Sequence, residues 1–490
     1  MKNKKLASVL FSLAAAILFS LIFYAFTTPL GPSIGSDNAM YMTMGTALAQ
    51  GYAPYTEIFD HKGPLVYLLQ WLPQEAGGGY NTLTLFVQQV VFLFSCLRIL
   101  DAICQRAGLC SAAVQTVYLT LICSLTGGGN LTEEYACVFT LAGILLILHV
   151  FGDGLGSARG LFPRAALLGA MAMLAFLTRA NNALVLCAMT LALAASLLLA
   201  RRYAQLLACA GGFIAGMAAA ALPVCLWLLN CGALGEAIYG SIIHNMMYAE
   251  TGSASRLDML FHSGYGRCAI LMAALTCLGA LSWLRRSAAL SFAMAAGAAA
   301  AGLAAFISHK FYDHYLILGA PLAAVGAGMA LSFAAQALKK IRPGALAAAV
   351  MAVCLIWLGT NAKKTNDWRL ADLEGYRAMA PHAQELYAMV PEEDKDSFMA
   401  YRVEPMWYVA AQALPSMRFY FLQEVLADAD PAVMDEIVST FTSDPPRWLV
   451  IYYNREFGPP YDARVEEIFK TRYEFVASSG TYQLLRHKEM

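Results

Sequence analysis

Long apolar segments fill most of the first 361 residues, and they constrain the fold more than any other feature of the chain. An α-helix needs about 20 residues to cross the hydrocarbon core of a bilayer. Eleven apolar segments are candidate cores of such helices, and the shortest of them is residues 165–177: residues 6–26, 82–97, 112–125, 135–151, 165–177, 183–200, 203–229, 268–284, 288–307, 315–338 and 345–358. Only 13% of the residues are charged, against about 25% in soluble domains. The sequence therefore predicts a polytopic α-helical membrane protein with about 11 transmembrane helices.

Positively charged residues occur in alternate loops of this region, which gives the predicted orientation. They are Lys2, Lys4, Lys5, Arg98, Arg106, Arg159, Arg164, Arg201, Arg202, Arg285, Arg286, Lys339, Lys340 and Arg342. Lys and Arg concentrate in cytoplasmic loops, and all of these fall on one side if every span is real. The first span, residues 6–26, is longer than the apolar core of a signal peptide, so we expect it to be retained. The prediction is a multi-pass protein of the cell membrane, with a cytoplasmic N-terminus.

The opposite set of loops is acidic and carries most of the histidines. Its titratable residues include Asp37, Glu57, Asp60, His61, Glu133, Glu134, His244, Glu250, His262, His309, Asp313 and His314. Carboxylates and imidazoles are the common general acids and bases. We therefore expect the chemistry of this protein on the outer face of the membrane.

The chain changes character after residue 361. Residues 1–361 form the predicted membrane domain, whereas residues 362–490 have the mixed composition of a soluble domain. Strand-like and helix-like stretches alternate there. The strands are expected at residues 397–402, 447–453, 473–476 and 482–485, and helices at residues 431–440 and 461–469. This pattern predicts an extracytoplasmic α/β domain, without a P-loop or nucleotide fingerprint, that caps the outer site or binds the acceptor.

The first outer loop, residues 27–81, is long enough to contain structure of its own. Asp37 lies in the first turn of one expected helix, which ends at Gly51. Pro64 begins a second apolar run that Pro73 closes, and this run is too short to span a bilayer. We expect two short helices that lie on the membrane surface.

Three charged residues each admit a structural and a functional explanation. Asp37 can simply cap the helix, whose dipole favours the ionised carboxylate, or it can belong to a functional site. Lys62, the only Lys or Arg in the first outer loop, can extend its charge to the membrane interface or hold a phosphate as a point charge. Arg179, at the end of the fifth span, can be an interface anchor or part of a functional site.

Three outer segments carry recognisable residues. They are Gly35-Ser36-Asp37 with Tyr41, Ala47, Gly51, Pro54-Tyr55, Phe59-Asp60, Lys62 and Pro64-Leu65; then Asn130-Leu-Thr-Glu-Glu-Tyr135; and last His309-Lys-Phe-Tyr-Asp-His-Tyr315 with Pro321. In this order they resemble the outer loops of GT-C glycosyltransferases, and the nearest branch resembles bacterial relatives of protein mannosyltransferases and of the aminoarabinose transferase. The family often has Lys-Pro-Pro-Leu where this chain has Lys62-Gly-Pro-Leu.

The resemblance implies a multispan enzyme that moves a sugar from a polyprenyl-phosphate donor to a lipid, glycan or protein acceptor of the cell envelope. It places the family's catalytic aspartate at Asp37 and its second acid at Glu133, with Glu134 as the close rival. It places the lysine near the lipid phosphate at Lys62. Further candidates for donor-phosphate binding are Arg179, His309, Lys310, His314 and Tyr315. Transfer by a single displacement would invert the anomeric centre.

No cofactor is predicted, and membrane lipids are the only other expected partners. The twelve cysteines lie between Cys96 and Cys354 without a CxxC pair, which argues against a zinc or redox motif. The outer histidines could hold a divalent metal with a carboxylate, but no spacing such as HxxxH supports this. The net charge is zero, so no basic surface indicates nucleic acid.

Two other functions are compatible with this pattern. A transporter or flippase for lipid-linked sugars would be expected to carry charged residues at mid-membrane, and the span interiors have almost none. A non-catalytic envelope-assembly protein that binds lipid-linked sugar would differ from an enzyme only in activity.

Overall fold

The computed structural model describes residues 2–152, 157–338, 343–452 and 462–488. The chain divides into two compact units. The first unit comprises Met1–Ala25, Phe86–Leu226 and Gly252–Asp367, and the second comprises Phe26–Leu85, Trp227–Thr251 and Trp368–Met490. Each unit is therefore assembled from three separate stretches of the chain.

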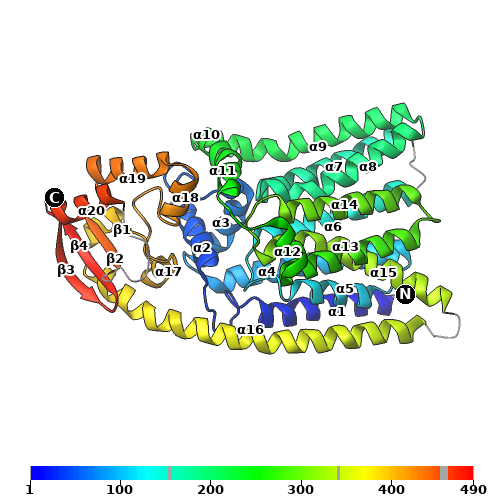
Figure 1. The fold of residues 1–490 in the computed structure, drawn as a ribbon, viewed down its shortest axis with the longest axis horizontal. Helices are drawn as coiled ribbons and strands as arrows, with labels where there is room; N and C mark the ends of the chain where they lie inside the picture. Colours follow the sequence, from blue (N-terminus) through cyan, green and yellow to red (C-terminus); the bar gives the residue numbers. More distant parts are fainter. Residues whose placement is uncertain (1, 153–156, 339–342, 453–461, 489–490) are drawn as a thin grey trace. The chain divides into compact units, whose positions relative to one another are not determined.

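The first unit is a bundle of apolar helices that lie side by side (Figure 1). Its helices are α1 (Lys2–Phe23), α4 (Thr82–Ala107), α5 (Ser111–Ile122), α6 (Thr132–Gly152), α7 (Ala158–Thr178), α8 (Leu184–Leu199), α9 (Tyr203–Asn230), α12 (Arg256–His262), α13 (Gly264–Trp283), α14 (Ala288–Phe306), α15 (Ala320–Ala337) and the membrane part of α16 (Pro343–Ala388). Helices α4, α9 and α16 continue into the second unit. The predicted polytopic membrane fold is confirmed.

Ten helices of the described part of the chain are long and apolar enough to span a membrane. They match ten of the predicted spans, including the short prediction at residues 165–177, which is part of the 21-residue α7. The remaining prediction, residues 112–125, coincides with α5, which has only 12 residues. At about 1.5 Å per residue, α5 rises about 18 Å, less than the roughly 30 Å of a hydrocarbon core. The structure thus shortens this span without removing it from the bundle.

Small residues let the helices of the bundle approach closely. A side chain at Gly279 of α13 would meet the backbone of Gly326 of α15 at 2.3 Å. Such contacts are typical of helix packing in membranes, where close backbone approach replaces the hydrophobic effect as the source of stability. One buried acid, Asp101 of α4, is also satisfied inside the bundle: it accepts hydrogen bonds from Gln105 and Ser111 and pairs with Arg98 at 3.0 Å.

The second unit contains a mixed four-stranded sheet in the order β1-β2-β4-β3. The strands are β1 (Phe398–Ala400), β2 (Trp448–Tyr452), β3 (Tyr473–Ser479) and β4 (Tyr482–His487). Strand β1 is parallel to β2, and the other neighbours are antiparallel. The helices around it are α17 (Met406–Ala411), α18 (Gln423–Ala429), α19 (Ala432–Ser443) and α20 (Ala463–Arg472). All four predicted strands are present, although Tyr453 and Tyr461, at the ends of two predictions, lie outside the described residues.

The first outer loop and the C-terminal segment belong to this same unit. The loop contributes α2 (Ser36–Ala49) and α3 (Pro64–Gly77), so both expected helices are present. Helix α3 continues past Pro73, where we expected it to end, and closes only at Gly78, which adopts a left-handed conformation (φ 73°). Pro73 has no N–H to donate within the helix, and the helix nevertheless continues through it, with Pro73 and Gln74 both buried.

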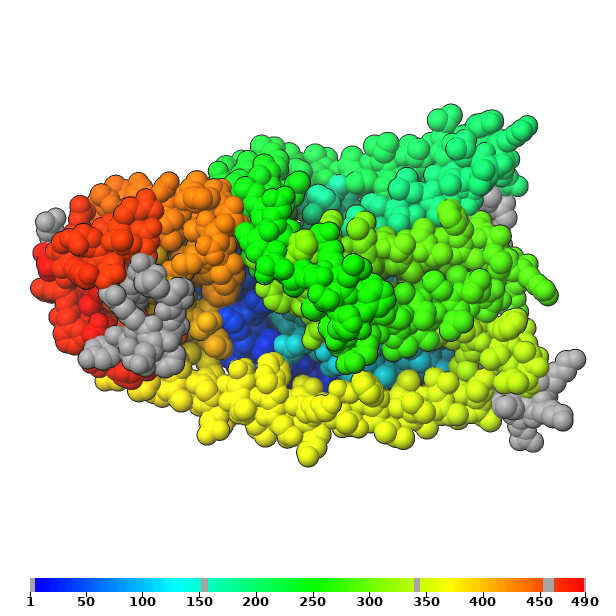
Figure 2. All heavy atoms as spheres, in the orientation of Figure 1, coloured from blue at the N-terminus to red at the C-terminus, as the bar shows by residue number. Residues whose placement is uncertain are grey.

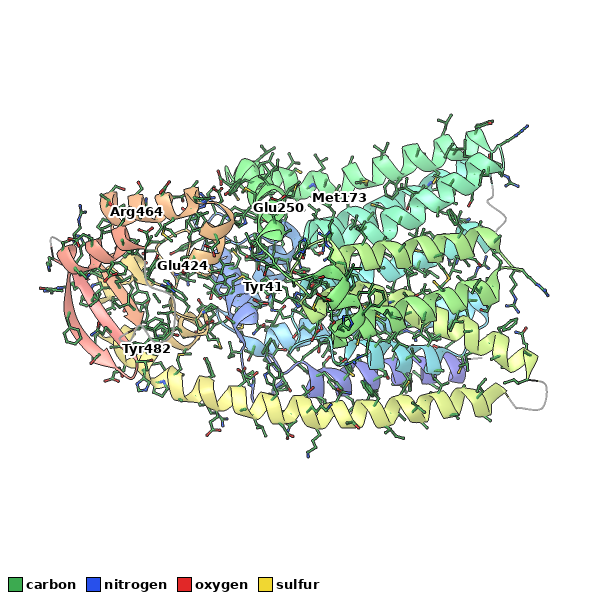
Figure 3. All side chains as sticks on the ribbon, viewed as in Figure 1. Tyr41, Met173, Glu250, Glu424, Arg464 and Tyr482 are labelled. Atoms are coloured by element: carbon green, nitrogen blue, oxygen red, sulfur yellow. The ribbon has the colours of Figure 1, made fainter. Side chains whose placement is uncertain are left out.

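Long-range hydrogen bonds join the three stretches of the second unit. The hydroxyl of Tyr420 donates to the Met40 carbonyl of α2 at 2.9 Å, and that of Tyr80 donates to the Ala413 carbonyl at 2.7 Å. The middle stretch, Trp227–Thr251, contains α10 (Leu234–Ile238), a π-helix (Tyr239–His244) and α11 (Asn245–Glu250). Figure 2 shows the orange surface of α18 and α19 directly against this green segment. Tyr41 on α2 and Glu424 on α18 mark two of these elements in Figure 3.

Candidate functional site

A strained turn places Asp37 at the start of α2. Ile34 (φ 72°) and Gly35 (φ 67°) both adopt left-handed conformations just before the helix. A side chain at Gly35 would overlap the Phe26 ring at 2.2 Å, so only glycine fits this position. Ser36 donates a hydrogen bond to Glu404 at 2.6 Å.

The Asp37 side chain is exposed in the first turn. The helix is capped by Gly35 without a side-chain hydrogen bond, and no described group donates to the Asp37 carboxylate. Asp37 therefore does not serve as a hydrogen-bonding cap. An ionised carboxylate at this position would still be favoured by the helix dipole, and it is accessible to a ligand.

Lys62 lies in a compact cluster with Asp60, His61 and Tyr67, which we call the Lys62 cluster. The Lys62 ammonium lies 3.1 Å from Nε2 of His61 and 3.9 Å from Oδ1 of Asp60. The Tyr67 hydroxyl donates to Oδ2 of Asp60 at 2.9 Å and accepts the Lys62 backbone N–H at 3.0 Å. The side chain of Lys62 is only 16% exposed, so it is held in place and does not extend freely to an interface.

The electrostatics of the Lys62 cluster favour an ionised Asp60. Burial by itself would raise the pKa of Asp60, but Lys62, His61 and the hydrogen bond from Tyr67 outweigh burial and hold the pKa well below its usual range. Burial and the Asp60 carboxylate raise the pKa of Tyr67 well above its ordinary value. Tyr67 therefore remains a hydrogen-bond donor, and Asp60 remains the buried counter-ion of Lys62.

Two distant segments brace the Lys62 cluster. The Asn245 amide of α11 donates to the His61 carbonyl, and the Tyr248 ring lies 5.0 Å from the His61 ring. Next to the cluster, the Phe59 N–H donates to the Arg418 carbonyl at 2.9 Å. The Arg418 guanidinium lies 5.1 Å from the Phe59 ring centre. The C-terminal segment thus fixes the backbone that leads into Asp60.

A second cluster forms at helix ends of the first unit. Arg179, between α7 and the next turn, pairs with Glu133 of α6 at 3.0 Å and donates to the Tyr315 hydroxyl at 2.9 Å. Its guanidinium also lies 4.4 Å from the Tyr315 ring centre. Thr132 donates to the other oxygen of Glu133 at 2.9 Å. We call Glu133, Arg179 and Tyr315 the Glu133 cluster. Since Glu133 is only 1% exposed, Arg179 is tied to it and is not a loose interface anchor.

The neighbouring acid, Glu134, has a different environment. One of its oxygens accepts the backbone N–H of Leu131 at 3.1 Å, the reach-back of a capping box at the start of α6. Its side chain lines a separate pocket with Tyr24, Gln89 and Tyr118. Adjacent residues of a helix point about 100° apart, so the two glutamates face different partners.

The candidate residues of the late outer loop differ in whether they interact with the Glu133 cluster. His314 interacts electrostatically with Glu133 and stacks on Tyr312 with ring centres 5.6 Å apart. His309 is directed elsewhere in the first unit, with Nδ1 2.8 Å from the Ala254 carbonyl. Lys310 is half-buried beside it. Glu133, Arg179 and Tyr315 are thus in direct contact, and His314 lies within electrostatic range.

Backbone strain accompanies each candidate segment. Ile34, Tyr55 and Asn130 have positive φ values of 72°, 65° and 64°, and they precede Asp37, the Lys62 cluster and Glu133 in turn. Strained backbone persists only where surrounding structure enforces it, and it is concentrated at functional sites. Within the described ranges no group of three or more His, Cys, Asp or Glu side chains is arranged to hold a metal ion.

Sequence reasoning missed the partners of Lys62. In the sequence, His61 stands out only as a member of the acidic, histidine-rich set of loops, Asp60 stands out also among the residues that carry the family resemblance, and neither Tyr67 nor Asn245 is singled out. The signal available was the close spacing of an acid, an imidazole and the one cation of the loop. The bracing by Asn245 and Arg418 crosses such large sequence separations that no local pattern could have shown it.

The fold is shared with solved structures of a class of large polytopic membrane proteins. ArnT from Cupriavidus metallidurans in the apo state is similar with a TM-score of 0.61 and 13% identity over 98% of each chain. The same enzyme bound to undecaprenyl phosphate gives 0.57 and 14% over 97% of each chain. The apo oligosaccharyltransferase of Archaeoglobus fulgidus gives 0.52 and 12%, covering 98% of this chain and 74% of that one.

Residues 1–344 match the family described as putative competence-induced protein Ccs4 N-terminal domain. This match covers well over half of the 490-residue chain, and the chain belongs to that family. No curated protein matches the sequence.

Proposed function

We propose that this protein is a membrane glycosyltransferase that moves a sugar from a polyprenyl-phosphate donor to an acceptor of the cell envelope. The observation that carries the proposal is that one compact unit contains both an exposed carboxylate, Asp37, and a lysine, Lys62, that is held by an acid and an imidazole. The fold shared with ArnT, whose structure has been determined with undecaprenyl phosphate, supports a polyprenyl-phosphate donor.

Asp37 is the proposed general base. An acceptor hydroxyl needs a carboxylate to orient it or to take its proton as the new bond forms at the anomeric carbon. Asp37 is exposed and accepts no hydrogen bond from a described group, so its oxygens can serve an incoming hydroxyl. In a single displacement the acceptor oxygen attacks as the bond from sugar to phosphate breaks, and the configuration of the sugar is inverted.

Lys62 is the proposed partner of the leaving phosphate. Negative charge grows on the phosphate oxygens as the glycosyl bond breaks, and a positioned cation stabilises that charge. Lys62 is held by the Lys62 cluster, and its side chain remains 16% exposed. Asp60 offsets the positive charge of Lys62. The stabilisation that Lys62 gives to the phosphate therefore depends on the direction in which its ammonium points as much as on its charge.

The Glu133 cluster is the proposed second acidic site. Glu133 is favoured over Glu134 for this role because Glu133 meets Arg179, whereas Glu134 completes the start of α6. Arg179, Tyr315 and His314 are the proposed contacts to the donor from this unit, with His309 and Lys310 as further candidates. A guanidinium can bind a phosphate with two parallel hydrogen bonds.

We further propose a cytoplasmic N-terminus and an extracytoplasmic C-terminal domain, so that transfer takes place on the outer face. The alternating Lys and Arg residues support this orientation. Residues 362–490 would then lie outside the membrane, where they can cap the site or bind the acceptor. The expected acceptor is a lipid, glycan or protein of the envelope.

The test compares envelope glycans by mass spectrometry in cells with the protein, without it, and with Asp37→Asn. A glycan should lose a sugar on deletion. Asp37→Asn keeps the shape of the side chain and should lower transfer by at least about 100-fold, the lower end for a general base. A phosphatase fused after Met490 in the same strains should be active only in the proposed orientation. Unchanged glycans on deletion would contradict the enzyme and favour a non-catalytic role.

A further inference from the structure

The contact between Lys62 and His61 defines the state of the imidazole. An ammonium group can only donate hydrogen bonds, so the Nε2 atom of His61, 3.1 Å away, is the acceptor. A neutral imidazole then carries its proton on Nδ1. That atom lies 3.2 Å from Oδ1 of Asp60, in an electrostatic contact that is not a well-aligned hydrogen bond. His61 therefore lies between the acid and the lysine with one ring nitrogen facing each.

The surroundings of His61 leave its ring little freedom. The residue is 2% exposed. The Tyr248 ring lies 5.0 Å away and the His244 ring 5.9 Å away, both from the segment 227–251. The Asn245 amide donates to its backbone carbonyl. A ring fixed on its faces and at its backbone can hold the ammonium of its neighbour in one direction.

The charges of the cluster make that direction important. Asp60 is ionised and Lys62 is its counter-ion, so the two cancel when His61 is neutral. A phosphate approaching the cluster meets no net positive charge. Attraction must then come from ammonium N–H groups aimed at the phosphate oxygens, and such charge-assisted hydrogen bonds depend on geometry.

We propose that His61 is a positioning residue that aims the Lys62 ammonium at the phosphate of the polyprenyl donor. The proposal rests on the function proposed above, because it assumes that Lys62 meets that phosphate. His61 itself need not touch the donor. Its contribution is to accept one N–H of Lys62 through Nε2, so that the remaining N–H groups point toward the ligand.

Two substitutions separate this role from a general structural one. In His61→Gln the side-chain oxygen can take the place of Nε2 and accept from Lys62. In His61→Asn the shorter amide can take only the place of Nδ1, beside Asp60, and it does not reach Lys62. Both variants remove the ring and keep a polar side chain, so the loss of packing is matched between them.

The experiment measures the binding of undecaprenyl phosphate to the purified full-length protein in detergent. His61→Asn should weaken binding by about tenfold, the scale of one hydrogen bond to a charged group. His61→Gln should recover most of that loss. In a Lys62→Ala background His61→Asn should have no further effect, since the ammonium that it positions is gone. Melting temperatures of the two His61 variants should agree.

Other results of the binding experiment would contradict either the positioning role of His61 or the phosphate role of Lys62. Equal binding by both His61 variants and the wild type, with Lys62→Ala still weakened, would overturn the positioning role and leave the proposed function intact. Equal losses in both variants that persist in the Lys62→Ala background would assign His61 to the structure of the loop alone. Wild-type binding by Lys62→Ala would contradict the phosphate role of Lys62, and the inference about His61 would fail with it.

Discussion

The Glu133 cluster takes its side chains from three segments far apart in the chain, whereas the Lys62 cluster takes all four from residues 60–67. In the first, each residue sits at an end of an apolar helix of the bundle. In the second, the residues lie on an irregular segment and at the start of α3. Both clusters contain a buried carboxylate paired with a cation.

The difference shows two ways to hold a charged pair. The helices that carry the Glu133 cluster are fixed by their own packing, so the pair needs no further support. The Lys62 cluster depends on Asn245 and on Arg418 from distant segments. We therefore expect substitutions in the C-terminal segment of the second unit to affect the Lys62 cluster and to spare the Glu133 cluster.

The largest effect is expected from breaking the pair between Glu133 and Arg179. Glu133→Gln leaves the Arg179 guanidinium, 12% exposed, without its anionic partner. Removing one member of a buried pair costs about 3–5 kcal/mol of stability. The free energy of unfolding can be measured by titration with a denaturing detergent in mixed micelles.

Glu134→Gln is the matched control, since it makes the same change one residue away. It should cost only about 0.5–2 kcal/mol, the scale of a helix cap. The double substitution Glu133→Gln with Arg179→Met removes both charges and should restore much of the stability without restoring transfer. If the single and double variants are equally unstable, the pair is not the reason that Glu133 is buried there.

A smaller effect is expected from Arg418→Gln in the C-terminal domain. Arg418 pairs with Glu436 at 3.1 Å and with Glu236, and lies over the Phe59 ring. Two partly exposed pairs and one cation–π contact together stabilise by about 1–2 kcal/mol. We expect weaker binding of undecaprenyl phosphate, by about three- to tenfold, because Phe59 leads directly into the Lys62 cluster.

The control for Arg418 is Arg464→Gln, which removes the same charge elsewhere in the domain. Arg464, labelled in Figure 3, pairs with Asp435 and Asp462 on the surface of the C-terminal segment. Its loss should leave donor binding unchanged. Equal effects of the two substitutions would show that the domain acts through its overall stability or charge, and the bracing role of Arg418 would be wrong.

The smallest effect is a dependence of stability on pH through His244. Burial lowers the pKa of His244, although its contact with the Leu426 carbonyl and the charge of Asp430 oppose this shift. A histidine whose pKa is lower in the folded state stabilises the fold above its unfolded pKa of about 6.5, and the contribution is lost as the pH falls. The slope cannot exceed about 1.4 kcal/mol per pH unit for one proton.

The measurement is the melting temperature of the wild type and His244→Gln between pH 5 and pH 8. Glutamine can still donate to the Leu426 carbonyl but does not titrate in this range. The melting temperature of both proteins should fall between neutral and acidic pH. The fall should be larger in the wild type than in His244→Gln. Parallel curves would show that His244 does not contribute to acid sensitivity.

The bundle could be predicted because hydrophobicity is a local property of the chain. Ten spans and all four strands follow from runs of apolar or alternating residues. The length of α5 could not be read in this way, because Cys123–Leu125 are as apolar as the helix they follow. Where a helix stops inside an apolar run depends on its neighbours.

Local sequence patterns also do not predict which residues of the candidate site contact one another. The sequence names both Glu133 and Glu134 as candidates for the second acid. Because they are adjacent on a helix, only one of them can face a given partner. Which one meets Arg179 depends on the rotation of α6 in the bundle, and no local pattern encodes that rotation. Lys62 was likewise identified by its charge, but its partners depend on how an irregular segment folds over α3.

The second unit is assembled from three separate stretches of the chain, so its parts are synthesised at different times. Residues 26–85 leave the ribosome early, yet Asn245 and Arg418, which complete their packing, are made only after most of the apolar helices. Until then Phe59 and its neighbours lack their cover and must be kept from aggregation by the membrane or by a chaperone. A chain that terminates after α15 would keep Asn245 but would lack the contacts of Arg418 with Phe59. Translation of the last segment is thus the step at which the contacts between Arg418 and Phe59 can first form.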